Sequence, residues 1–288
     1  MELRTQGNEV ALMLDSGENH RLSALPPTNA DLIGKEQPVD VVVLTKNSER
    51  LLEKCLTSVY ENLPVNRLIV VDGNSTDSTL EIVDKFCQKY RNVIVIGDKV
   101  TRGSARLNGI REVQTAWFVF VDSDVILCDR WYEKARGYIA DNVGAIWGTE
   151  VWAGMSNPNV LKLFLRVTRK VFELRGGTHD LLVRTEAIKD ISIPGDLHVF
   201  EDAFIKDWMT KKGYRSIPTY DPFCIHYRPQ SVWTMRGSID LFVEALRYGS
   251  VRKIPKYFLA YAFYTVYVAH RALSRGPTGY LRGQGGRS

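Results

Sequence analysis

The 288-residue sequence lacks any run close to the roughly 20 apolar residues that a helix needs to cross a bilayer. It holds only four cysteines, which lie far apart and show neither the spacing of a zinc site nor a disulfide framework. That usage fits a reducing compartment. The N-terminus carries acidic residues early and no apolar signal segment, which argues against secretion. Together these absences predict a cytoplasmic protein.

Three nucleotide-binding signatures are also missing. No GxGxxG follows the first apolar run, residues 39–45, which argues against a dinucleotide-binding oxidoreductase. No GxxxxGK[ST] occurs, so the chain is not a P-loop enzyme. No nucleic-acid-binding motif accompanies its basic residues, and we expect no nucleic-acid partner.

Acidic residues are scarce at the C-terminal end. From Pro229 to Ser288, nine Lys or Arg residues stand against Asp240 and Glu244, a balance of +7. Because the whole chain has a net charge of +5, the first 228 residues sum to −2. The basic character therefore belongs to the tail.

From Val39 onward, short apolar or β-branched runs alternate with segments of helical periodicity. This alternation predicts a mostly parallel central sheet flanked by helices, with right-handed crossovers. Ligands of such sheets bind beyond the carboxyl ends of the strands, where Thr45, Asp72 and Asp122 stand. The expected strands are 39–45, 67–72, 93–96 and 117–121, and the expected helices lie over 51–59, 80–87 and 105–113.

The run FVFVDSDV, residues 118–125, ends a buried-looking strand in two carboxylates. Asp122 and Asp124 point to the same side of an extended chain, where they repel each other unless a divalent cation lies between them. In the alternative interpretation the strand has ended, and both residues lie in a solvated turn or cap the next helix. The crevice shared with Thr45 and Asp72 favours the cation.

Six stretches resemble, in order, those of a family 2 glycosyltransferase with the GT-A fold. They cover roughly residues 39 to 228. The resemblance implies an inverting transfer from a UDP- or GDP-linked sugar, with Mn²⁺ or Mg²⁺ as cofactor. The stretches are VVVLTKNSERLLEKCLTSV, IVVDGNSTDSTLEIV, RGSARLNGI, FVFVDSDV, GGTHDLLVRTEAI and FEDAFIKDWMTKKGY.

On the donor side, the resemblance implies that Thr45, Asn47 and Asp72 hold the nucleoside, with the Asp72 carboxylate accepting from the base. Arg106 would face the diphosphate. The alternatives are a strand-end threonine, a turn aspartate and a solvated helix arginine. Gly73 and Asn74 suit a tight turn with positive φ.

The same resemblance implies a metal site. Asp124 would ligate the cation, Asp122 would contact the ribose or the metal, and His226 would be a further ligand. Carboxylates suit such a hard cation, which offsets the charge of a leaving diphosphate. For His226, a purely structural role is the alternative.

On the acceptor side, Asp202 of the pair Glu201-Asp202 would be the general base, and Trp208 would flank the acceptor. Gly177 and His179 would belong to the acceptor loop, since glycine permits close approach. The alternatives are helix capping by the two acids, packing by Trp208 and hydrogen bonding of His179 within its loop.

We therefore expect a polar extension over 1–37, a GT-A catalytic domain over 38–228, a basic helical region over 229–275 and a disordered tail over 276–288. In the third part, 238–249 predicts an amphipathic helix, and the tyrosine-rich run 257–269 suits a helix in a membrane interface. The alternative is that this second helix packs on the domain.

The predicted function is transfer of a sugar to a lipid-linked acceptor, a polyprenyl phosphate or a glycolipid, by an enzyme bound peripherally to the cytoplasmic membrane face. One alternative is a catalytically silent domain that binds a nucleotide sugar or a partner, and another is transfer to a soluble glycan. A nucleotidyltransferase would need a Gly- and Lys-rich loop after the first strand, which TKNSER is not.

Overall fold

The computed structural model describes residues 37–98, 101–153, 177–227 and 235–249, and single positions at 255, 258, 259, 262 and 266. Residue contacts divide the chain into two units, Met1–Lys35 and Glu36–Ser288, and every described residue belongs to the second. Apart from Gln37, the predicted extension over 1–37 lies outside the described residues, as does the predicted tail over 276–288.

Strands and helices alternate in the first half of the second unit. Strands β3, β2, β1 and β4 are neighbours in that order and run parallel, so their carboxyl ends meet at one edge. The predicted series is thereby confirmed. It consists of β1 (Val39–Thr45), α2 (Leu52–Asn62), β2 (Val65–Asp72), α3 (Thr79–Tyr90), β3 (Val93–Gly97), α4 (Arg102–Glu112) and β4 (Trp117–Asp122).

The second half makes the sheet mixed. The full order is β3-β2-β1-β4-β7-β6-β8-β5, in which β7 is antiparallel to β4 and β6, and β5 is antiparallel to β8. Only the β6–β8 pair is parallel here. The elements are β5 (Val125–Leu127), α5 (Trp131–Arg136), β6 (Val143–Trp152), β7 (Asp180–Arg184), α7 (Thr185–Ile188), α8 (Glu201–Lys211), β8 (Arg215–His226) and α9 (Met235–Tyr248).

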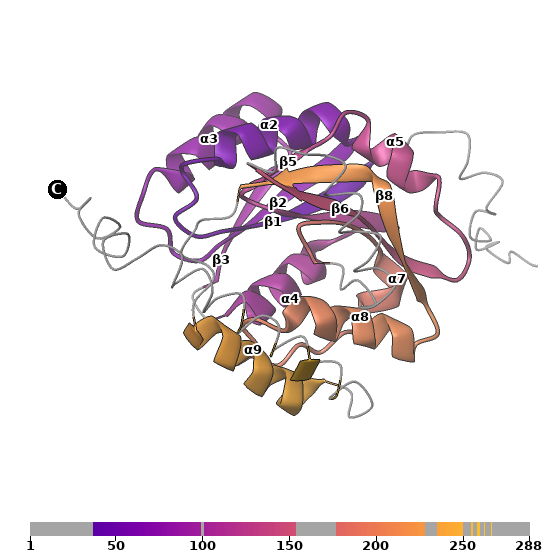
Figure 1. Ribbon diagram of the computed structural model, residues 1–288. Helices are drawn as coiled ribbons and strands as arrows, with labels where there is room; N and C mark the ends of the chain where they lie inside the picture. The colour runs from indigo at the N-terminus through magenta and orange to yellow at the C-terminus, as the bar shows by residue number, and fades with distance from the viewer. Residues whose placement is uncertain are drawn as a thin grey trace, which may run out of the picture. The chain divides into compact units, whose positions relative to one another are not determined.

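Helices cover both faces of this sheet (Figure 1). Helices α2, α3 and α5 pack on one face and α4, α7, α8 and α9 on the other. Within β1, Val41 and Val43 point to the first face and Val42 to the second, and all three are fully buried. Burial on both faces explains why these strands have continuous apolar sequences rather than alternating ones.

Helix α9 is the predicted amphipathic helix, although it begins three residues before Ser238. Its Ala245 is buried in the second core cluster, and Leu241 and Tyr248 pack against that cluster. The opposite side of α9 carries three large apolar side chains that are about half exposed. They are Ile239 at 49%, Val243 at 53% and Leu246 at 45%.

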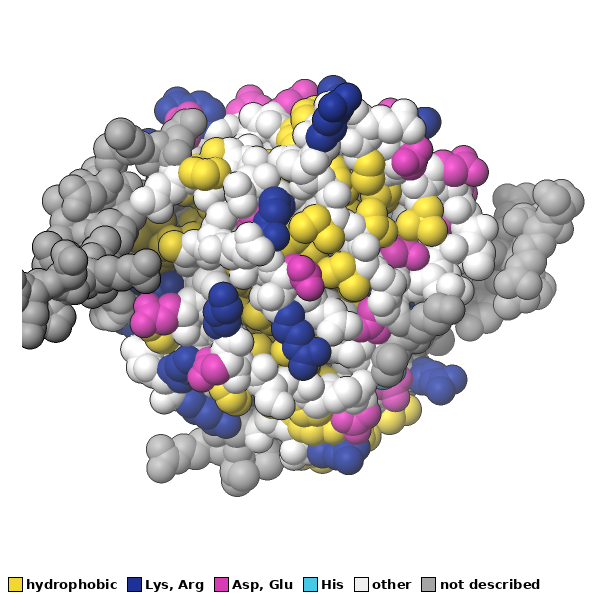
Figure 2. All heavy atoms as spheres, turned by 180° about the vertical axis from the view of Figure 1, so that it is seen from behind, with side chains coloured by type: hydrophobic (Ala, Val, Ile, Leu, Met, Phe, Trp, Pro, Cys, Tyr) yellow, Lys and Arg dark blue, Asp and Glu magenta, His cyan; other side chains and the backbone are white. Residues whose placement is uncertain are grey.

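The aromatic run that follows is described only in part. Phe258, Leu259 and Val266 are helical and exposed, and the Phe258 ring centroid lies 6.1 Å from that of Phe242 on α9. No helix among the residues described is both long and apolar enough to cross a membrane. On the side of the molecule shown in Figure 2, basic and acidic side chains are interspersed with apolar ones.

Candidate active site

The loops after β1 and β2 meet at the carboxyl edge, as predicted. Thr45 Oγ1 donates a hydrogen bond of 2.8 Å to Asp72 Oδ1, and both residues are buried. Ser75 donates from its backbone nitrogen to Asp72 Oδ2 (2.8 Å) and from Oγ to Oδ1 (2.6 Å). Asn47 Oδ1 accepts from the backbone nitrogen of Thr76 (2.8 Å), so the Asn47 side chain joins the two loops.

The turn after Asp72 agrees only in part with the sequence analysis. Asn74 adopts φ = 63°, as predicted, and Asn47 has φ = 49°. Gly73 does not have a positive φ. Its lack of a side chain instead leaves room for Lys46, because a Cβ at position 73 would lie 3.2 Å from Lys46 Cδ.

Arg106 on α4 is a buried cation at the same edge. Its Nη2 donates to Asp122 Oδ1 (2.6 Å) and Thr178 Oγ1 (2.5 Å), and its guanidinium lies 4.9 Å from the centre of the Phe120 ring. The residue is 3% exposed, which rules out a solvated helix arginine. Among the described residues, no partner is found for Nε or Nη1. Buried donors without a partner cost free energy, so these two atoms are suited to an anionic ligand.

Asp122, Asp124 and His226 converge beside Arg106. Each residue offers one possible metal-ligand atom, and the three atoms lie within 4.8 Å of one another. His226 Nε2 is 3.0 Å from Asp124 Oδ1. Burial raises the pKa of Asp122, but the Arg106 guanidinium and the His226 imidazole outweigh burial and hold that pKa below its usual range. Two carboxylates and an imidazole fit a divalent cation such as Mn²⁺ or Mg²⁺. The geometry favours this site over a solvated turn.

Glu150 on β6 is a site residue that the sequence analysis missed. Its Oε1 lies 2.9 Å from His226 Nδ1, on the opposite side of the ring from Asp124. Burial lowers the pKa of His226, but hydrogen bonds to Asp124 and Glu150 raise it to about 9. A carboxylate on the far nitrogen is the usual means of orienting a metal-binding histidine. The signal in the sequence was a single acid within the otherwise apolar strand AIWGTEVW.

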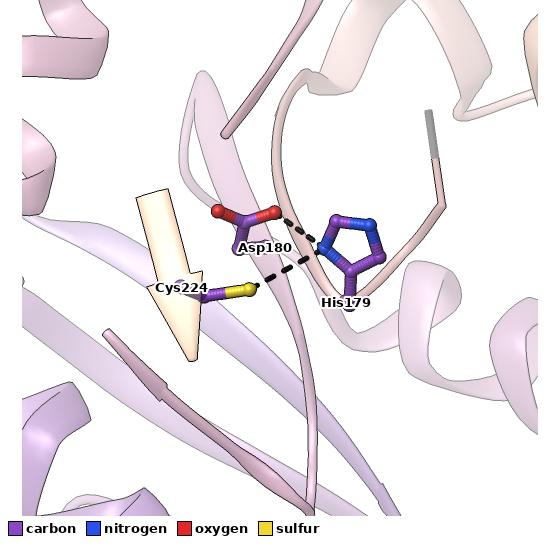
Figure 3. A group of neighbouring side chains, drawn as sticks. All are labelled: His179, Asp180 and Cys224. Atoms are coloured by element: carbon purple, nitrogen blue, oxygen red, sulfur yellow. Dashed lines mark hydrogen bonds and ion pairs between the residues drawn. The ribbon is translucent and has the colours of Figure 1, made fainter. Parts of the chain in front are cut away.

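A second cluster adjoins this site at Glu150, which lies 3.8 Å from His179. It comprises His179, Asp180 and Cys224 (Figure 3). His179 Nδ1 is 2.5 Å from Asp180 Oδ1 and 3.6 Å from Cys224 Sγ. Ligand atoms of a tetrahedral zinc ion with bonds of about 2 Å lie about 3.3 Å apart. The distance between His179 Nδ1 and Asp180 Oδ1 is shorter than that spacing, so the cluster as it stands does not suit a metal.

Asp180 is held in place by its burial and by contacts with Trp131 and Gly148. It is fully buried, and its Oδ2 accepts a 3.0 Å hydrogen bond from Trp131 Nε1. A Cβ at Gly148 would overlap Oδ2, so only glycine leaves room for the carboxylate. Burial lowers the pKa of His179, but the Asp180 carboxylate outweighs burial and raises it above its usual value.

The contacts of His179 favour hydrogen bonding within the protein over the acceptor contact that the resemblance implies. Its ring is buried and lies 3.8 Å from Glu150, and its carbonyl accepts from the backbone nitrogen of Asp122 (3.1 Å). A Cβ at Gly177 would lie 2.5 Å from His179 Cδ2, so the close approach permitted by this glycine is to His179. The cluster thus supports the end of β4 through the bond between the His179 carbonyl and the Asp122 backbone nitrogen.

Helix α8 begins with the two acids expected on the acceptor side. Glu201 is 5% exposed, and burial and the neighbouring Asp202 raise its pKa to about 7 in spite of Arg106 and Arg102. Asp202 is half-buried, accepts from the backbone nitrogen of Ala203 (2.6 Å) and lines a small cleft with Trp147 and Leu181. Leu181 pairs with Phe120, two residues before Asp122, which puts this cleft close to the carboxyl edge.

Trp208 lies towards the other end of α8 and is partly buried against the second core cluster. Its carbonyl accepts from the backbone nitrogen of Lys212, whose Nζ bonds Asp190 Oδ1 at 2.6 Å. Asp190 follows α7, which begins after Arg184, the residue paired with Trp117 at the amino end of β4. The structure thus favours packing for Trp208 over an acceptor contact.

Comparison with known proteins agrees with this fold. A poly(ribitol-phosphate) beta-glucosyltransferase of Bacillus spizizenii is 36% identical over 108 residues, which are 34% of this chain and 17% of that protein. The mannosyltransferase PcManGT from Pyrobaculum calidifontis, solved with GDP-Man and Mn²⁺, superposes with a TM-score of 0.62 at 21% identity, over 88% of this chain and 80% of that one. TarS of S. aureus, solved with UDP-GlcNAc, gives a TM-score of 0.53 at 20% identity, over 73% of this chain and 66% of that one.

The structural matches are below 25% identity and establish the GT-A fold alone. The curated relative is covered over a small part of its length. A model of the family described as "Glycosyl transferase family 2" matches residues 40–184, which hold the sheet edge, Arg106 and the Asp122-Ser123-Asp124 motif. Because that match covers half of the chain, the protein belongs to glycosyl transferase family 2.

Proposed function

We propose that the chain is a metal-dependent glycosyltransferase that moves a sugar from a nucleotide diphosphate donor with inversion at the anomeric carbon. The observation that carries this proposal is the meeting of Asp122, Asp124 and His226 within 4.8 Å. These residues lie beside two donors of Arg106 for which the described part of the chain offers no partner. The complexes of two structural neighbours, with GDP-Man and Mn²⁺ and with UDP-GlcNAc, support a donor of this class.

The nucleoside would bind at the Thr45–Asp72 pair. Three hydrogen bonds from Thr45 and Ser75 already reach the Asp72 carboxylate, two at Oδ1 and one at Oδ2. A carboxylate has about four acceptor positions, so one remains at Oδ2 for an N–H group of the base. Asn47 would act indirectly, because its side-chain oxygen already holds Thr76.

The diphosphate would bind at the Arg106 edge. A divalent cation held by Asp122, Asp124 and His226 supplies neutralisation of the charge that grows on the leaving diphosphate. Arg106 contributes two further donors, Nε and Nη1, from a buried position where hydrogen bonds to an anion are strong. Glu150 keeps the His226 ring turned so that Nε2 faces Asp124 and the cation site.

Asp202 would take the proton from the acceptor hydroxyl as it attacks the sugar from the face opposite the diphosphate. A general base must lie within hydrogen-bond reach of that hydroxyl. Asp202 is half-buried at the start of α8, in a cleft between that helix and β6.

The test of this function is release of nucleoside diphosphate from a panel of UDP- and GDP-linked sugars, with Mn²⁺, with Mg²⁺ and with EDTA. We expect one donor to raise the melting temperature and to be hydrolysed slowly, and both effects to disappear with EDTA. Binding without release for every donor would instead favour the catalytically silent domain. A donor turned over equally well in EDTA would contradict the metal site.

For the acceptor, we propose a lipid-linked one, a polyprenyl phosphate or a glycolipid, reached from the cytoplasmic membrane face. Support comes from the half-exposed Ile239, Val243 and Leu246 on one side of α9 and from the exposed Phe258 and Leu259 that follow. These apolar groups occur in the same part of the chain as the +7 charge. An apolar helix face with basic residues suits the surface of an anionic membrane.

We expect the full chain to sediment with anionic liposomes at low salt and to be released at high salt. Replacement of Ile239, Val243 and Leu246 by serine together should weaken this binding about tenfold or more, because each buried apolar side chain contributes about 1.5–3 kcal/mol. Leu80→Ser, on the exposed face of α3, is the matched control. Equal sedimentation of all three proteins would leave the soluble-glycan acceptor as the better proposal.

A further inference from the structure

Glu244 on α9 is bonded to the chain just before α8. Its Oε1 accepts from the backbone nitrogen of His198 (3.0 Å), and its Oε2 accepts from those of Val199 (2.7 Å) and Phe200 (2.9 Å). Three successive backbone N–H groups that converge on one carboxylate form an anion-binding nest. The next two residues are Glu201 and Asp202.

The start of α8 has no side-chain cap at its N-cap position. The N-cap residue is Phe200, whose side chain forms no capping hydrogen bond. A carboxylate beside a helix N-terminus also interacts favourably with the helix dipole. Glu244 accepts from the backbone nitrogen of the N-cap residue itself, as the glutamate of a capping box does, but it reaches that nitrogen from α9.

Two more residues of α9 hold the same segment. Arg247 Nη1 donates to Asp196 Oδ2 (2.7 Å), and the Tyr248 hydroxyl donates to Asp196 Oδ1 (2.6 Å). Helix α9 lies alongside α8 and α4 in Figure 1, and its Ala245 is buried in the core cluster they share. The segment 196–200 is thus fixed from the α9 side at both of its ends.

On its other side, the segment is fixed to the helix that carries Arg106. The carbonyl of Leu197 accepts from the backbone nitrogen of Gly103 (3.0 Å), and the carbonyl of Gly195 accepts from Thr101 Oγ1 (3.0 Å). A Cβ at Gly103 would lie 2.7 Å from the Leu197 carbonyl oxygen, so the two backbones are in close contact. The chain before Asp202 therefore lies between α4 and α9.

We propose that Glu244 is a positioning residue for Asp202, so that α9 completes the active site. This inference rests on the proposed role of Asp202 as general base. Glu244 touches no substrate in this scheme. It fixes the backbone of residues 198–200 and therefore the direction in which α8 begins. That direction sets the position of the Asp202 carboxylate relative to the acceptor.

The test compares Glu244→Ala, Glu244→Gln and the control Asp240→Ala, an exposed acid on the outer side of the same helix. Glu244→Ala should lower kcat for donor hydrolysis roughly 10- to 100-fold, the usual effect of misplacing a reacting group by about 1 Å. Donor KM should stay unchanged, because Arg106 is also held by Asp122 and Thr178, and Thr45 and Asp72 lie at the ends of β1 and β2. Glu244→Gln keeps an acceptor oxygen and should recover most of the rate.

Combining Glu244→Ala with Asp202→Asn separates positioning from general damage. If Glu244 acts through Asp202, the double variant should be no slower than Asp202→Asn alone. Amide hydrogen exchange should also be faster at 198–203 in Glu244→Ala, with protection in β1 and β4 retained.

Each contrary result has its own meaning. Additive losses, or a fall in donor affinity that matches the fall in kcat, would overturn the positioning role and leave the proposed function standing. Full activity of the single variant Asp202→Asn would show that Asp202 is not the general base, and this inference would then fail as well. The single Asp202 variant therefore tests the proposed function, and the combination tests Glu244.

Discussion

Replacement of Asp124 by alanine is expected to abolish metal-dependent turnover and to leave the fold intact. The change removes one of the three donor atoms that lie within 4.8 Å of one another. It also relieves repulsion between two carboxylates when no cation is bound. The ion pair between Asp124 Oδ1 and His226 Nε2 (3.0 Å) is lost, but the Asp124 carbonyl still accepts from the backbone nitrogen of Tyr227 (2.9 Å), which keeps this position tied to the end of β8.

The measurement is turnover as a function of Mn²⁺ concentration, with Mn²⁺ binding followed separately by electron paramagnetic resonance. Asp84→Ala removes an exposed carboxylate on α3 and should change neither quantity. The melting temperature without metal should stay close to that of the wild type, because the loss of the Asp124–His226 ion pair is offset by the relief of repulsion from Asp122. Near-normal turnover that ignores Mn²⁺ would show that the Asp122-Ser123-Asp124 motif is not a metal site.

Replacement of Asp202 by asparagine should lower kcat by about 10²–10⁴, the usual contribution of a positioned proton acceptor. The substitution is nearly isosteric, and an amide oxygen can still accept from the backbone nitrogen of Ala203. Donor binding should therefore persist, which a titration in the presence of Mn²⁺ would show. Asp207→Asn makes the same chemical change five residues later on α8 and serves as the control.

The choice of acceptor matters for this experiment. A phosphate acceptor is already ionised at neutral pH and needs little help from a base, so donor hydrolysis, in which water is the acceptor, is the cleaner assay. An unchanged kcat for hydrolysis would mean that Asp202 only stabilises the start of α8, as acids in the first turn of a helix do.

The first half of the fold could be predicted because its signals are local. Runs such as VDVVVLT are apolar on both faces only in a covered sheet, and the helices between them are long enough for crossovers. The second half gave weaker signals. Strand β5 has three residues, and β7 has five that run antiparallel to β4. Nothing in their sequences specifies the partner strand.

The candidate site divides in the same way. Thr45, Asp72 and Asp122 end neighbouring parallel strands, so a pattern of strands was enough to bring them together. Glu150 and Glu244 could not be found in this way. The partner of Glu150 is a histidine on another strand, and the partners of Glu244 are backbone N–H groups, which leave no trace in a sequence.

The contact between Gly148 and Asp180 restricts the order in which these two positions can be substituted. Any other residue at 148 would overlap the Asp180 carboxylate, so the change at 180 must come first. That first step removes the acceptor of Trp131 and the partner of His179 at once. The effects of the two substitutions are therefore not additive, because the second is tolerated only in the background of the first. A lineage that keeps Asp180 therefore has to keep glycine at position 148, for a reason of packing alone.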